Sequence, residues 1–159
     1  MKKTVESFKY ILDAWKEHIK ADPGAFALTD TSGHSLSRLE ADELSDRIHA
    51  YLVKHDIGKD DVVLINLKRS VRSVVAVMGV MKAGAAFVLV EAGAATERVN
   101  YIRKSCNAKF DLSEENWNEA LSCEPEREYV IADDHALALC VYTSGTSGTP
   151  KCVMHEFGQ

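Results

Sequence analysis

Residues near the C-terminus combine the side chains that a polyphosphate site needs. Five hydroxyl side chains and two glycines fall within residues 143–149, and Lys151 follows after Pro150. Glycines let the backbone curl so that several N–H groups point toward one anion. Hydroxyls add small donors, and a lysine adds a charge-assisted contact. The candidate phosphate-binding residues are therefore Thr143, Ser144, Gly145, Thr146, Ser147, Gly148, Thr149 and Lys151.

The spacing within residues 143–151 excludes two other kinds of phosphate site. A Walker loop counted from Gly145 would need glycine where Pro150 stands, and the chain contains no G-x-G-x-x-G. The plain alternative is a surface turn, because Gly, Ser, Thr and Pro are all common in turns. The order of the residues and the apolar segment before them favour the phosphate interpretation. The motif supplies neither a nucleophile nor a base, so no catalytic residue is assigned.

Metal and redox chemistry are not indicated. The four cysteines are separated by 17, 17 and 12 positions, with no C-x-x-C pair. Zinc ligation and a disulfide framework are therefore not expected, and we predict reduced thiols. The histidines have no ligand spacing, and we expect them at the surface; they are His18, His34, His49, His55, His135 and His155.

Composition limits the partners. The 159 residues carry a net charge of −5, which argues against nucleic acid as a partner because phosphate neutralisation needs a basic face. The apolar fraction of 46% excludes bulk disorder. No signal core is present, and the apolar run around Lys82 falls short of a membrane span of about 20 residues. We expect a cytoplasmic chain without a membrane partner.

Alternating strand and helix patterns must position the phosphate motif. Apolar runs at 62–67, 86–90, 108–112 and 136–142 predict strands. Helices are predicted between and around them, including one that starts at Ser37 with a capping box to Glu40 and one from Ser70 to Lys82. Residues 122–134 are acidic and predict a solvated loop. The order predicts an α/β fold with a mainly parallel sheet flanked by helices, in which ligands bind beyond the carboxyl ends of the strands.

Residues 142–151 resemble the phosphate-loop signature of the adenylate-forming, or AMP-binding, ligases. The segment 81–88, MKAGAAFV, is similar to the Leu-Lys-Ala-Gly-x-Ala-Tyr-Val stretch of nonribosomal peptide synthetase adenylation domains. The segment 97–102, ERVNYI, resembles the Glu-Arg-hydrophobic stretch that follows it, and 35–39 loosely resembles the entry to the second helix. The order fits over essentially all 159 residues. One departure is Cys152, where the family usually has glycine.

The resemblance implies a function and its partners. Such enzymes use ATP, with magnesium, to activate a carboxylate, and then pass the acyl group to a thiol. The implied substrate is an amino acid, and the implied acceptor is carrier-protein phosphopantetheine or coenzyme A. The motif at 143–151 would hold the β- and γ-phosphates.

Length completes the prediction. Members of the resembled family are several hundred residues long. Residues 1–159 are therefore expected to be a partial AMP-binding, or adenylation, domain: the part of its N-terminal subdomain that ends just after the phosphate loop. The remaining active site would lie downstream or in a complementing polypeptide, and the isolated chain is expected to be inactive. The alternatives are a non-catalytic nucleotide or phosphate-binding module and a structural remnant.

Overall fold

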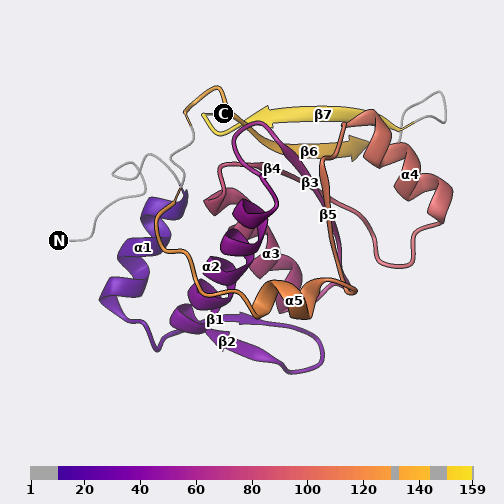
Figure 1. Cartoon of the computed structure of the whole chain (residues 1–159). Helices are drawn as coiled ribbons and strands as arrows, with labels where there is room; N and C mark the ends of the chain where they lie inside the picture. Colours follow the sequence, from indigo (N-terminus) through magenta and orange to yellow (C-terminus); the bar gives the residue numbers. More distant parts are fainter. Residues whose placement is uncertain (1–10, 130–132, 144–149, 159) are drawn as a thin grey trace.

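The structure is a computed structural model that describes residues 11–129, 133–143 and 150–158. Figure 1 shows helices packed on both faces of a central sheet, with a small hairpin at one end. The helices are α1 (Ile11–Ala21), α2 (Arg38–Lys54), α3 (Val71–Lys82), α4 (Thr96–Ser105) and α5 (Trp117–Leu121). The strands are β1 (Phe26–Thr29), β2 (Ser35–Ser37), β3 (Val62–Asn66), β4 (Ala86–Leu89), β5 (Phe110–Ser113), β6 (Leu137–Thr143) and β7 (Lys151–Glu156).

The central sheet has the strand order β5-β3-β4-β6-β7. β3 is parallel to β4 and β5, and β4 is parallel to β6, whereas β7 is antiparallel to β6. The connection through α3 leads from β3 to its neighbour β4, and the connection through α4 leads back across to β5. Right-handed crossovers in opposite directions place their helices on opposite faces. The predicted α/β fold with a mainly parallel sheet is confirmed.

Each face of the sheet has its own apolar core. One core lies under α2, α3 and α5 and includes Val63 and Ile65 of β3. The other lies under α4 and includes Leu64, from the same strand. Since successive residues of a strand point to opposite faces, the continuous apolar run of β3 serves both cores. Its four residues from Val62 to Ile65 are all buried.

The start of α2 is the one predicted from its sequence. The hydroxyl of Ser37 accepts a hydrogen bond from the amide of Glu40 at 3.3 Å. The Glu40 carboxylate in turn accepts one from the amide of Ser37 at 2.7 Å. This reciprocal capping box satisfies two amides that the first helical turn leaves without partners.

Two strands and one burial pattern differ from the sequence prediction. β2 and β7 were not predicted, because they are short or polar strands that form by pairing with β1 and β6. The apolar run that predicts β6 is typical of a strand covered on both faces, yet within β6 only Cys140 is buried. The helices α2, α3 and α5 cover β3, β4 and β5, and no β6 residue belongs to their core.

Helices α2 and α3 approach each other at Gly79. A Cβ atom at this position would lie 2.6 Å from the Cβ and Cγ2 atoms of Ile48 and 3.0 Å from the carbonyl oxygen of Ser45. Real Cβ atoms essentially never come that close to other heavy atoms. Only glycine therefore permits this helix–helix distance.

We predict that Gly79→Ala lowers the free energy of unfolding by about 1–3 kcal/mol, because forcing the packed helices apart outweighs the better helix propensity of alanine. Urea denaturation followed by circular dichroism measures the change. The matched control is Gly58→Ala, where a Cβ would meet no atom within 4 Å, and its stability should be unchanged or slightly higher. A Gly79→Ala protein as stable as the control would contradict the packing argument.

A second prediction concerns the apolar surface over β4, β6 and β7. Leu89, Val141 and Val153 are 53%, 39% and 42% exposed, and the register pairs Val141 with Val153. Exposed apolar patches and outer strands favour self-association. We expect the chain to associate with further copies of itself at high concentration, as measured by light scattering. The double variant Val141→Thr/Val153→Thr should associate less, while Val53→Thr, an exposed valine on α2, should not differ from wild type; equal behaviour of the two variants would contradict this.

Candidate functional site

The phosphate motif spans the connection between β6 and β7. Thr143 is the last residue of β6 and Lys151 is the first residue of β7, and the two are paired in the register of the sheet. Because β6 is parallel to β4, this connection follows the carboxyl end of the parallel strands. Both Thr143 and Lys151 are exposed. The other predicted phosphate ligands lie outside the described residues; they are Ser144, Gly145, Thr146, Ser147, Gly148 and Thr149.

Helix α4 contacts the chain on both sides of the connection. The hydroxyl of Tyr101 donates a hydrogen bond of 3.0 Å to the carbonyl oxygen of Pro150. The hydroxyl of Tyr142 donates one of 3.3 Å to the carbonyl oxygen of Ile102 and also contacts the hydroxyl of Ser105. These tyrosines could not be predicted from the sequence, because their contacts depend on how α4 lies over the sheet.

Three thiols lie beneath this region. Cys106 and Cys140 are buried, and Cys152 packs against the same core below α4. Burial raises the pKa of Cys140 to about 12 and also raises the pKa of Cys106, since a thiolate is poorly solvated there. Both groups are therefore neutral thiols at physiological pH, and the structure contains the four cysteines as free thiols. Thiols of this kind are unreactive packing groups.

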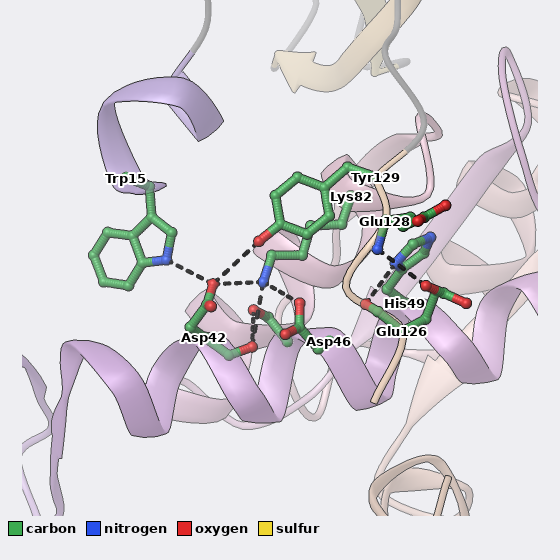
Figure 2. A network of polar contacts seen from close by, with 9 residues as sticks. Trp15, Asp42, Asp46, His49, Lys82, Glu126, Glu128 and Tyr129 are labelled. Atoms are coloured by element: carbon green, nitrogen blue, oxygen red, sulfur yellow. Dashed lines mark hydrogen bonds and ion pairs between the residues drawn. The ribbon is translucent and has the colours of Figure 1, made fainter. Parts of the chain in front are cut away.

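A second cluster of polar side chains is centred on Lys82, at the end of α3 (Figure 2). The Lys82 side chain has 0% exposure. Its ammonium nitrogen lies 2.6 Å from Oδ1 of Asp46 and 2.7 Å from Oδ1 of Asp42, and it also donates to the carbonyl oxygen of Asp42 at 3.2 Å. These three acceptors match the three donors of an ammonium group. Burial raises the pKa of Asp46, and the hydrogen bond from Lys82 opposes that rise.

Aromatic side chains complete the surroundings of this ion cluster. The indole Nε1 of Trp15 donates to Oδ1 of Asp42 at 3.0 Å, and the hydroxyl of Tyr129 donates to the same oxygen at 3.4 Å (Figure 2). The Tyr129 ring lies 4.8 Å from the Lys82 ammonium and 3.7 Å from that of Lys16, which are cation–π distances. Burial and the two nearby aspartates raise the pKa of Tyr129, so the phenol remains a donor.

His49 is buried, which corrects the expectation that all histidines lie at the surface. Its Nδ1 lies 3.2 Å from the carbonyl oxygen of Glu126, and the amide of Glu126 donates to the carbonyl oxygen of Asp46 at 3.2 Å. A carbonyl only accepts, so Nδ1 carries the proton. Burial lowers the pKa of His49, which favours the neutral ring. Residues 122–129, predicted as a solvated loop, are thus held against α2.

Two features of the sequence indicate this cluster. Asp42 and Asp46 are four residues apart and share one face of α2, beside the buried Ser45 and His49. Lys82 interrupts a long apolar run, which indicates a charge that needs buried partners. The arrangement is structural, since every donor of the Lys82 ammonium has an acceptor.

Two other kinds of site are not found in the part of the chain that the structure describes. No group of three His, Cys, Asp or Glu side chains is placed to hold a metal ion. None of the described helices has the length and apolar character of a membrane span.

Comparison with known proteins defines the class to which this fold and motif belong. Residues 15–159 match the family model described as AMP-binding enzyme, and the chain therefore belongs to this family.

The curated relatives are peptide synthases. Surfactin synthase subunit 1 of Bacillus subtilis (strain 168) is 35% identical over 158 residues, which cover 91% of this chain and 4% of that protein. Tyrocidine synthase 3 of Brevibacillus parabrevis is 31% identical over 159 residues, which cover 89% of this chain and 2% of that protein. The chain thus spans only a small part of these relatives.

Solved structures show the same fold. The N-terminal subdomain of Klebsiella oxytoca NpsA in complex with anthranilyl-AMSN has a TM-score of 0.84 at 22% identity, covering 94% of this chain and 41% of that one. ATP-bound MatB from Rhodopseudomonas palustris has a TM-score of 0.73 at 18% identity, covering 86% of this chain and 32% of that one. The fold is that of the N-terminal subdomains of adenylate-forming enzymes.

The ion cluster yields a stability prediction. Lys82→Met leaves the buried carboxylate of Asp46 and the partly buried one of Asp42 without their cation, so we expect a loss of about 3–5 kcal/mol in the free energy of unfolding. Urea denaturation measures it. Adding Asp42→Asn and Asp46→Asn to Lys82→Met removes the uncompensated charges and should recover part of the loss.

The matched control for Lys82 is Lys20, whose side chain is 72% exposed and forms a 3.1 Å ion pair with Glu17. Lys20→Met should cost less than about 1 kcal/mol, because exposed ion pairs contribute little. Equal losses in the two single variants, or no recovery in the triple variant, would contradict the assigned role of Lys82.

Proposed function

We propose that this chain supplies the phosphate-binding part of an ATP-dependent ligase that activates a carboxylate as its adenylate. The observation that carries the proposal is the pairing of Thr143 with Lys151 at the ends of β6 and β7. These two ends of the motif lie at the carboxyl edge of a parallel sheet, where ligands of such folds bind, and this position supports the proposal. Membership of the AMP-binding family supports the same assignment.

In the complete enzyme, the motif would hold the β- and γ-phosphates of ATP while the carboxylate attacks the α-phosphorus. The bond between the α-phosphorus and the bridging oxygen breaks, and pyrophosphate leaves with the electron pair. The proposed ligands are Thr143, Ser144, Gly145, Thr146, Ser147, Gly148, Thr149 and Lys151. Their contribution is positioning and neutralisation of charge, with no proton transfer. Magnesium would accompany ATP, and we assign it no ligand in this chain.

The substrate and acceptor follow from the similarity to the peptide synthases. We propose an amino acid as the carboxylate and a carrier-protein phosphopantetheine, or coenzyme A, as the thiol that receives the acyl group. This chain corresponds to 41% of the NpsA subdomain. Adenine and acyl pockets would therefore need further polypeptide, from the same chain or from a complementing one.

We predict weak binding of pyrophosphate and ATP by the chain alone, with a dissociation constant no tighter than about 1 mM, equivalent to −4 kcal/mol. Several charge-assisted hydrogen bonds at about 1.5–3 kcal/mol each are offset by the ordering of backbone at roughly 1–2 kcal/mol per residue. Titration calorimetry at constant ionic strength measures the affinity. Lys151→Ala should weaken binding, more at low salt than at high salt, because screening reduces the contribution of an exposed charge.

Lys20→Ala is the matched control, an exposed lysine on α1, and should leave the affinity unchanged. Micromolar affinity for ATP, or no loss of affinity in Lys151→Ala, would contradict the role given to the motif. Phosphate binding without ATP–pyrophosphate exchange in the completed enzyme would identify a non-catalytic phosphate-binding module instead. The absence of binding in both contexts would identify a structural remnant.

A further inference from the structure

The chain on both sides of the phosphate motif forms hydrogen bonds with α4. Tyr142, one residue before Thr143, bonds the end of α4 through the carbonyl oxygen of Ile102 at 3.3 Å and through the hydroxyl of Ser105. Tyr101, on α4, bonds the carbonyl oxygen of Pro150, one residue before Lys151, at 3.0 Å. A hydroxyl bond thus ties α4 to the chain at each end of the motif.

The two tyrosines also contact each other. Their ring centroids lie 6.5 Å apart with an interplanar angle of 73°, an edge-to-face arrangement that is favourable between aromatic rings. Tyr142 is half-buried and packs against the core under α4, whereas Tyr101 is 39% exposed. The pair therefore connects the inside of the fold to the surface at which Lys151 begins β7.

Helix α4 is itself held in place from the other side. Val99 and Ile102 are buried against the sheet. Arg103 donates through Nε to both carboxylate oxygens of Asp111 on β5, at 3.1 and 3.0 Å. Since β5 and β6 are separated by two strands in the sheet, α4 spans the face and is anchored at both sides. Because α4 is held by these contacts, it can fix the position of the backbone next to the motif.

We propose that Tyr101 and Tyr142 are positioning residues for the phosphate motif, which hold Thr143 and Lys151 at a fixed place over α4. This inference rests on the proposed function, because it concerns the same site. Neither hydroxyl needs to touch a phosphate: each acts through the backbone on one side of the motif. Fixing that backbone in advance removes part of the ordering cost that phosphate binding would otherwise carry.

The test uses the full chain, inorganic pyrophosphate as the probe, and single deletions of a hydroxyl group. Tyr101→Phe and Tyr142→Phe keep the rings and remove the bonds to Pro150 and to α4. Each should weaken pyrophosphate binding about fivefold, the factor expected for one lost neutral hydrogen bond. Thermal unfolding midpoints should shift by less than about 3 °C. Binding is followed by amide chemical shifts at constant ionic strength.

The matched control is Tyr51→Phe. Its hydroxyl donates a 3.1 Å bond to Glu119 on the opposite face of the sheet, so the chemical change is the same and the place is different. This variant should leave pyrophosphate affinity unchanged. An equal loss in Tyr51→Phe would overturn the proposal, because the effect would then be a general one on stability.

A double-variant cycle separates positioning from a merely structural role. If Tyr101 acts by placing Lys151, then Tyr101→Phe should cost less than about twofold in affinity once Lys151→Ala is present. The same fivefold loss in both backgrounds would overturn the coupling between the two residues.

Amide hydrogen exchange tests the positioning role of the tyrosines separately from phosphate binding by the motif. Both tyrosine variants should speed exchange at Thr143, Lys151 and Cys152, with little change at β3. Unchanged exchange would overturn the inference even if pyrophosphate binds. Faster exchange in a protein whose wild-type form binds no pyrophosphate would support the contacts with α4 and overturn the phosphate role of the motif.

Discussion

A charged group with no exposed surface needs an opposite charge beside it, and Lys82 places this requirement on the packing of α3 against α2. Its two carboxylate partners both come from α2, so α3 has to pack along α2 in one register. Gly79, one turn earlier on α3, allows the close approach that this register demands. In this register the Lys82 ammonium reaches both carboxylates.

The same cluster extends to α1 and to the irregular segment that follows α5. Trp15 joins α1 to Asp42, and Tyr129 joins the connection before β6 to the same carboxylate. His49 and Asp46 hold the backbone of Glu126. Residues 122–129, which follow α5, are therefore held against α2.

The family match and the position of the motif's two ends are separate observations that support the proposed function. The AMP-binding match covers residues 15–159, and the fold resembles N-terminal subdomains of adenylate-forming enzymes. Independently, the described end of β6 and the start of β7 bring two of the predicted phosphate ligands into register at the carboxyl edge. The neutral thiols below them, Cys106 and Cys140, supply packing and no reactivity, so the proposed phosphate ligands remain the hydroxyls, the backbone and Lys151.

The sequence by itself determined the α/β class, the parallel strands, the capping box at Ser37 and the order of residues in the phosphate motif. Periodicity, turn residues and caps act between residues that are near in the chain, so they can be read from it. The partners of Lys82, the burial of His49 and the contacts of Tyr101 and Tyr142 were decided only by the tertiary structure. Each joins groups between 36 and 77 positions apart. Whether a polar side chain is solvated or buried with a partner depends on which distant element arrives beside it, and no local pattern carries that information.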